Sequence, residues 1–272
     1  MPLNQYDSHP SSRHPERARA KGDAAMLSEV REQHLVRIFF NGAPGFFVEV
    51  GANHPQDESK SWHLEQCGWS GILVEPQPEL AEKLRQARGA KVFAVACSSP
   101  ENAGALLPFY VAGALSSLDR DAMAPGSQAQ AIIEVPARTL DEVLVEAGAP
   151  QPLDFLSIDV EGHEIEVLRG FNFARWRPRL ILLEDHVGNL RKHRFLTSAG
   201  YRLVRRTGLN GWYIPADSPV RFGCGDRWQI LRKYYLALPI RILRNQSRRL
   251  RQPIKDWISA RRQLPQPPSH GR

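Results

Sequence analysis

Short apolar runs alternate with stretches in which apolar residues recur at helical spacing, and several runs end beside a polar residue. The runs are Phe46–Val50, Gly71–Glu75, Lys91–Ala96, Leu153–Ile158 and Leu180–Leu183. Continuous apolar runs of this length are typical of strands that are buried on both faces. Strands that alternate with helices form parallel sheets through right-handed crossovers. The sequence therefore predicts an α/β fold with a mostly parallel, doubly wound sheet and flanking helices.

The remaining pattern predicts the helices and the secondary strands. We expect helices at Asp23–Phe40, Trp62–Trp69, Glu79–Ala87, Glu164–Leu168 and Asn189–Ala199, and strands at Leu106–Val111, Ile132–Val135, Tyr201–Arg206 and Gly211–Ile214. In the first helix the expected apolar positions are Leu27, Val30, His34, Leu35 and Ile38. Thr139 and Glu142 have the spacing of a capping box, which predicts a further helix that begins there.

Charge is distributed unevenly along the chain. Residues 220–272 contain 13 Lys and Arg but two Asp and Glu, a net charge of +11, whereas residues 1–219 carry a net charge of −4. We therefore expect three parts: a mobile N-terminal segment at 1–23, a globular domain at 24–215 and a basic amphipathic extension at 220–272. An acidic body without an aromatic-studded basic motif argues against a nucleic-acid partner.

Composition excludes several classes of protein. The three cysteines, Cys67, Cys97 and Cys224, form no C-x-x-C pair, which argues against a disulfide framework or structural zinc and favours a reducing compartment. No apolar run reaches the length of a membrane span, and the first ten residues lack the apolar core of a secretory signal. We therefore expect a cytoplasmic protein.

Acidic residues at two neighbouring strand ends indicate the kind of ligand. Gly51 follows the first strand and allows a ligand to approach the backbone, while Glu49 places a carboxylate nearby. Glu75 ends the second strand, where a carboxylate can accept both hydroxyls of a ribose. The G-x-G-x-x-G fingerprint of dinucleotide enzymes is absent. This pattern favours a nucleoside with a positively charged substituent, and S-adenosylmethionine is such a ligand.

Three segments carry a family resemblance. Residues 45–53 (GFFVEVGAN), 64–76 (LEQCGWSGILVEP) and 154–164 (DFLSIDVEGHE) resemble, in this order, the motifs of FkbM-type methyltransferases, and Ser116–Leu118 also fits. The resemblance covers roughly residues 30–215. It implies a Rossmann-like fold, S-adenosylmethionine as cofactor and O-methyl transfer, often to a sugar hydroxyl of a glycan, glycolipid or natural product.

The resemblance also implies roles for individual residues. Glu49, Gly51 and Asn53 would hold the methionine end of the cofactor, Glu75 the ribose and Ser98 the adenine. Asp159 would either position the cofactor or accept the proton of the acceptor hydroxyl. Glu161 would act in the same way, bind a divalent metal with Asp159 and Asp185 or His186, or serve as a helix N-terminal acid.

Two histidines are candidates for the general base, because imidazole titrates near neutral pH. His186 directly follows a predicted strand and ranks ahead of His163, which lies at the start of a helix. The predicted catalytic set is therefore Asp159, His186 and Glu161, and no ligand motif requires a metal. The alternatives are a catalytically silent interaction module with this fold and another nucleotide-dependent α/β enzyme, such as a dehydrogenase.

The basic extension has two interpretations. Trp228, Leu231, Tyr234, Leu238 and Ile242 recur at helical spacing among arginines and lysines. Such a helix either lies on an anionic membrane, here the inner face, or packs on the domain with a solvated basic side.

Overall fold

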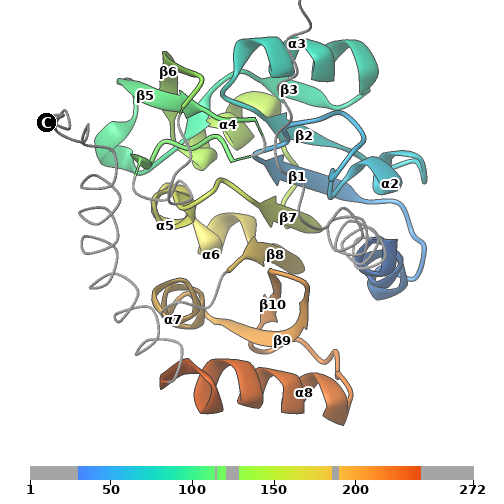
Figure 1. Ribbon diagram of the computed structural model, residues 1–272. Coiled ribbons are helices and arrows are strands. Elements are labelled where there is room, and N and C mark those ends of the chain that lie inside the picture. The colour runs from blue at the N-terminus through green and yellow to red at the C-terminus, as the bar shows by residue number, and fades with distance from the viewer. Residues whose placement is uncertain (1–29, 114, 121–128, 186–189, 240–272) are drawn as a thin grey trace, which may run out of the picture.

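A seven-stranded sheet forms the centre of the molecule in the computed structural model, which describes residues 30–113, 115–120, 129–185 and 190–239. The strand order is β3-β2-β1-β7-β8-β10-β9. The strands are β1 (Phe46–Val50), β2 (Ser70–Val74), β3 (Lys91–Phe93), β7 (Phe155–Ile158), β8 (Leu180–Glu184), β9 (Tyr201–Thr207) and β10 (Asn210–Pro215). Figure 1 shows this sheet crossing the molecule from β3 to β9.

The sheet is parallel except at β10, which pairs antiparallel with both β8 and β9. From β1 the chain builds outward through β2 to β3, and then returns to place β7 on the other side of β1. The strand order thus reverses between β1 and β7. Ligands of such sheets bind in the crevice at this switch point, outside the carboxyl ends of the strands. The topology confirms the predicted Rossmann-like α/β fold.

Two hydrophobic cores cover the two faces of the sheet. One core contains side chains of α4 (Leu140–Ala147), α5 (Glu164–Arg169), α6 (Phe173–Trp176) and α7 (Arg191–Ser198). The other contains side chains of α2 (Trp62–Glu65), α3 (Pro78–Ala87) and the helix at residues 30–39. Along β8, Ile181 and Leu183 join the first core, whereas Leu180 and Leu182 join the second. This alternation follows from the two-residue period of a strand.

A smaller sheet covers one end of the central one. It has the order β4-β6-β5, with β4 at Ala96–Cys97, β5 at Leu106–Val111 and β6 at Ala131–Arg138, and a short 3-10 helix, η1, lies at Pro100–Asn102. The capping box is present at the start of α4: the Thr139 hydroxyl accepts from Glu142 N at 3.1 Å, and the Glu142 carboxylate accepts from Thr139 N at 2.8 Å.

Three expectations need correction. The Trp62–Trp69 helix ends at Glu65, because the backbone turns through Gly68, which has a φ of +83°. The Lys91–Ala96 strand is two strands, since β3 joins the central sheet and β4 joins the smaller one.

In the helix at 30–39 the expected face was wrong: Val30 and Ile38 are 59% and 55% exposed, whereas Glu32 is 5% exposed. The buried positions 32, 36 and 40 form a different helical stripe. The predicted start of this helix at Asp23 lies outside the described residues.

The chain then returns along the edge strand β9 as a C-terminal helix, which consists of α8 (Cys224–Ile230) and a π-helical continuation, η3 (Leu231–Leu236). Figure 1 shows it beside β9, at the edge of the sheet opposite β3. Tyr234 and Leu238 are buried. This part of the extension therefore packs on the domain, as one of the two interpretations expected; residues 240–272 and the expected mobile segment 1–23 lie outside the described residues. Among the described helices, none combines the length and hydropathy that crossing a membrane requires.

Candidate active site

A cavity of about 500 Å³ opens at the carboxyl ends of β1, β2, β7 and β8. Of the residues predicted for the site, it is lined by Gly51, Asn53, Glu75, Asp159 and Glu161. These residues come from loops that are far apart in the sequence. They meet because the carboxyl ends of parallel strands lie at one edge of the sheet.

Gly51 lets the loops after β1 and β7 touch. Its φ is +84°, and a Cβ built at this position would lie 1.8 Å from the backbone oxygen of Asp159. The Asp159 amide in turn donates to the Val50 carbonyl at 3.0 Å. A side chain at position 51 would therefore push Asp159 away from the cavity. Glycine is needed here for close approach as well as for backbone conformation.

Glu75 lies in the cavity at the end of β2 and is held from two sides. One carboxylate oxygen accepts from Asn53 N and the other from Gln77 N, each at 2.9 Å. Burial raises the pKa of Glu75, although these two hydrogen bonds oppose that shift. Each carboxylate oxygen can accept a second hydrogen bond. The carboxylate is thus fixed in orientation and retains the capacity to accept two ligand hydroxyls.

Apolar side chains also line the cavity. They include Val74, Leu80, Val95, Cys97 and Leu118. Ser98, which was predicted to lie near the adenine, does not line the cavity: its hydroxyl is fully buried, 2.9 Å from His163 Nε2 and 2.9 Å from Asn102 Nδ2. Cys97, the last residue of β4, lines the cavity, whereas the Ser98 side chain is held by His163 and Asn102.

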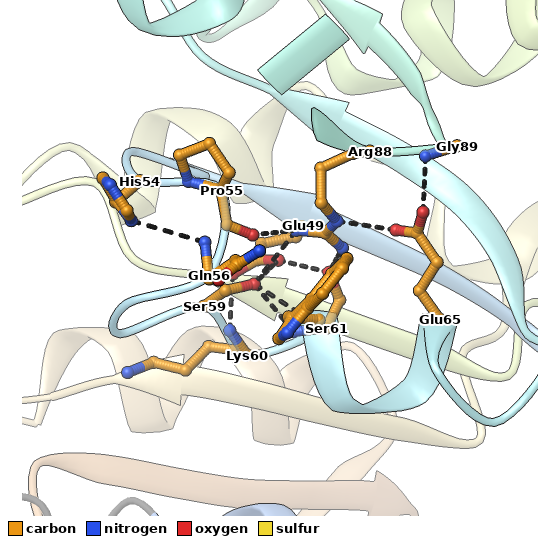
Figure 2. Close-up of polar contacts among 11 residues, drawn as sticks. Glu49, His54, Pro55, Gln56, Ser59, Lys60, Ser61, Glu65, Arg88 and Gly89 are labelled. Atoms are coloured by element: carbon orange, nitrogen blue, oxygen red, sulfur yellow. Dashed lines mark hydrogen bonds and ion pairs between the residues drawn. The ribbon is translucent and has the colours of Figure 1, made fainter. Parts of the chain in front are cut away.

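Glu49 organises a loop and does not line the cavity. Its carboxylate accepts from the hydroxyls of Ser59 and Ser61 and, at 2.7 Å, from Lys60 N. Figure 2 shows these contacts. The buried Arg88 guanidinium closes the cluster, with bonds to Ser61 Oγ at 2.9 Å and to Glu65 at 2.6 Å. The side chain of Lys60 leaves this cluster, and its Nζ lies 4.0 Å from Asp159 Oδ2. Glu49 therefore shapes the loop that places Lys60 at the site.

Three acids form the opposite part of the cavity. Asp159, Glu161 and Glu184, hereafter the acid trio, each offer a carboxylate oxygen within 4.8 Å of the others. Burial, followed by the charge of Glu184, raises the pKa of Asp159 well above its ordinary value, and Lys60 opposes the shift. Carboxylates this close together favour a bound cation or a shared proton.

The acid trio contains a different residue at the end of β8 from the one that the sequence predicted. Glu184, the last residue of β8, takes the place expected for Asp185 or His186. The Asp185 side chain accepts a 2.7 Å hydrogen bond from the Tyr234 hydroxyl of the C-terminal helix. His186 lies outside the described residues. His163 occupies the N-cap position of α5, its Nε2 contacts Ser98 away from the cavity, and burial lowers its pKa.

The loop after β7 is held by the smaller sheet. The hydroxyl of Ser117 donates to the Glu161 carbonyl at 2.6 Å. Glu161 has a φ of +48° and the following Gly162 a φ of +103°, so the backbone is unusual at both positions. Ser117 belongs to the Ser116–Leu118 motif, whose flanking residues Ser116 and Leu118 line the cavity. This motif therefore fixes the loop that carries Asp159 and Glu161.

Comparison with known families identifies the domain. The family model described as "Methyltransferase FkbM domain" matches residues 49–203, more than half of the chain. The chain belongs to the FkbM methyltransferase family. Among solved structures, precorrin-6y C5,15-methyltransferase from Geobacter metallireducens GS-15 is similar at 13% identity and a TM-score of 0.35, over 66% of this chain and 86% of that chain. A search of curated proteins found no match.

One wall of the cavity lies outside the matched FkbM range. Glu32 comes from the helix at 30–39, while Thr207 and Asn210 flank the turn between β9 and β10. The Glu32 carboxylate accepts from the Thr207 hydroxyl and, at 2.9 Å, from Asn210 Nδ2. We call these three residues the Glu32 wall. Sequence analysis missed all three, because a polar residue on an amphipathic helix or in a hairpin turn carries no local signal of a site.

Proposed function

We propose that this FkbM methyltransferase transfers the methyl group of S-adenosylmethionine to a hydroxyl of a carbohydrate-containing acceptor. The observation that carries the proposal is the single cavity that joins Glu75 to the acid trio. The carboxyl ends of β2 and β8 are three strand spacings apart, or about 14 Å. That separation accommodates a nucleoside at one end and the reacting group at the other.

The residues present fit the cofactor. Glu75 would hold the ribose hydroxyls, and the apolar surface of Val74, Leu80 and Cys97 would contact the adenine. Gly51 allows the loop after β7 to pack closely and bring Asp159 to the cavity. When bound, this cofactor supplies a methyl group on a positively charged sulfur. The acid trio would complement that charge.

Asp159 would accept the proton of the acceptor hydroxyl. It lies at the switch point of the sheet, and its raised pKa brings it closer to that of an effective base at neutral pH. Lys60, 4.0 Å away, would stabilise the ionised form. The same acids have the chemistry to hold a divalent cation, and that alternative calls for a separate measurement.

The cofactor proposal is tested by binding and by transfer. S-adenosylhomocysteine should raise the melting temperature by mass action, whereas NAD should not. Protein with radiolabelled S-adenosylmethionine should label a member of a panel of free sugars, nucleotide sugars and glycolipids. Binding of NAD alone would favour a dehydrogenase, and binding without transfer to any carbohydrate would overturn the acceptor class.

Removal of metal separates two roles of the acid trio. If the carboxylates balance the charge of the methyl donor, transfer should be unchanged after thorough chelation and should not rise with added Mg²⁺ or Mn²⁺. The measurement is the labelled-methyl assay on dialysed protein with and without chelator. Activity that is lost on chelation and restored by one of these ions would assign the trio to a metal.

The Glu32 wall should recognise the acceptor. It lies beside Glu184, since Asn210 pairs with Glu184 across β8 and β10, and it is remote from Glu75. Carboxylate and amide groups are suited to the hydroxyls of a sugar. Glu32→Gln keeps the side-chain volume but removes the charge. We expect the KM for the acceptor to rise about tenfold, as for a lost hydrogen bond to a charged group of about 1.5 kcal/mol.

The control for this experiment is affinity for the cofactor product. Kd for S-adenosylhomocysteine should be the same in Glu32→Gln and in the wild type, and Glu82→Gln, an exposed change on α3, should alter neither quantity. Equal losses of cofactor and acceptor binding would show that Glu32 acts on the fold of the cavity instead of the acceptor.

A further inference from the structure

The C-terminal helix presents large apolar side chains to solvent. Trp228 is 59% exposed and Tyr235 is 54% exposed, and Leu231 and Leu236 are also exposed. Trp228 lies in α8, and Leu231, Tyr235 and Leu236 lie in its π-helical continuation η3. We call these four residues the Trp228 patch. Large apolar side chains that are exposed close together in the sequence make this helix a candidate interaction site.

The opposite side of the helix is firmly attached to the domain. Arg205 of β9 makes a two-pronged ion pair with Asp226, at 2.9 and 3.0 Å. The buried Tyr234 donates to Asp185 at 2.7 Å and accepts from Arg206 at 3.1 Å. The helix is thus held in one orientation by charged and buried polar contacts. The Trp228 patch is therefore exposed while the helix is packed against the domain.

The charge around the patch indicates its partner. Arg221, Arg227 and Arg232 are exposed in the same segment, whereas its acid, Asp226, is paired with Arg205. The sequence that follows, residues 240–272, adds nine basic residues and one acidic residue. Aromatic rings and leucines among arginines are typical of helices that lie in the interface of an anionic bilayer.

We propose that the Trp228 patch docks the protein on membranes that contain anionic phospholipid. The apolar side chains would enter the headgroup region, and the arginines would meet the lipid phosphates. Asp185, which holds Tyr234, directly follows Glu184 of the acid trio, so the helix is attached next to the end of β8 that carries Glu184. If the proposed function holds, this placement suits an acceptor sugar carried on a lipid. Membrane binding itself does not depend on that function.

The test is co-sedimentation of the full chain with vesicles of phosphatidylcholine alone and with vesicles that also contain phosphatidylglycerol. We expect binding to the anionic vesicles and a decrease with salt. Arg227→Gln with Arg232→Gln should reduce the partition coefficient about fivefold for each arginine. The double variant Trp228→Ser with Tyr235→Ser should also have a lower partition coefficient, and this decrease should persist at low salt. Truncation is unsuitable, because it would remove Tyr234 from Asp185.

Two changes elsewhere on the surface serve as matched controls. Ile132→Ser removes an exposed apolar side chain from β6, and Lys83→Gln removes an exposed charge from α3; both should bind vesicles as the wild type does. Equal binding to both kinds of vesicle, no binding, or unchanged binding of the patch variants would overturn the proposal. A dimer in light scattering that Trp228→Ser dissociates would assign the patch to a second copy. S-adenosylhomocysteine affinity, measured in parallel, reports separately on the proposed function.

Discussion

Asp159→Asn is expected to lower methyl transfer by about 10²–10⁴-fold, the contribution of a positioned general base. The carboxylate lies in the cavity beside Glu161 and Glu184. In the proposed reaction it would accept the proton of the acceptor hydroxyl. In the wild type, the rate should fall as the pH is lowered, with a midpoint well above the ordinary value for aspartate, because burial and Glu184 raise the pKa of Asp159. The measurement is kcat against pH for the best acceptor of the carbohydrate panel.

The same substitution should make the protein more stable at neutral pH. Because the pKa of Asp159 is raised in the folded state, ionisation of this group destabilises the fold as the pH rises from the ordinary to the raised value. Asparagine removes that cost. The melting temperature of Asp159→Asn should therefore exceed that of the wild type near pH 8, by about 2–4 °C for each kcal/mol regained, and the difference should vanish near pH 4.

Glu82→Gln on α3 provides the control for both measurements, since it removes an exposed carboxylate that does not line the cavity. An Asp159→Asn protein that keeps full activity would show that the base lies elsewhere, and His186 would be the next candidate. A lower melting temperature at neutral pH would contradict the raised pKa.

Glu75→Ala should weaken binding of S-adenosylhomocysteine by roughly a hundredfold or more. Two ribose hydroxyls would lose a charged acceptor, at about 1.5–3 kcal/mol for each hydrogen bond. Isothermal titration calorimetry measures the loss directly. The substitution also leaves Asn53 N and Gln77 N without the carboxylate, so the melting temperature without ligand must be recorded to confirm that the fold persists.

Glu79→Gln is the matched control for Glu75, because Glu79 is four residues away and exposed on α3. Its affinity for S-adenosylhomocysteine should equal that of the wild type. If Glu75→Ala binds as tightly as Glu79→Gln, Glu75 takes no part in holding the ribose.

Local patterns in the sequence predicted the fold and brought several strand-end residues to one cavity. The β1 strand has the predicted bounds, Phe46–Val50, and α4 begins with the predicted capping box. Gly51, Glu75 and Asp159 were predicted to meet, and all three line the cavity. These predictions succeeded because an apolar run specifies a buried strand, and the topology of a parallel sheet brings the ends of such strands together.

Which side chains point into the cavity was decided by tertiary packing. Glu49 and Ser98 lie at strand ends as predicted, but Glu49 faces the Arg88 cluster and Ser98 faces His163. A shift of the strand register by one residue moves each side chain to the opposite face of the sheet, and the neighbouring segments determine the register. The sequence therefore located both residues without determining their partners.

The helix at 30–39 and the C-terminal helix show the same limit. Hydrophobic spacing selected Val30 and Ile38 for the core, yet the buried stripe contains Glu32, whose carboxylate is satisfied by Thr207 and Asn210, 175 and 178 residues away. In the C-terminal helix, Tyr234 is buried and Tyr235 exposed because Asp185 and Arg206 can bond the first hydroxyl. The sequence by itself determined which segments form helices and strands, since that depends on near neighbours. The tertiary structure alone decided which polar groups are buried, because burial is stable only where a distant segment supplies the hydrogen-bond partner.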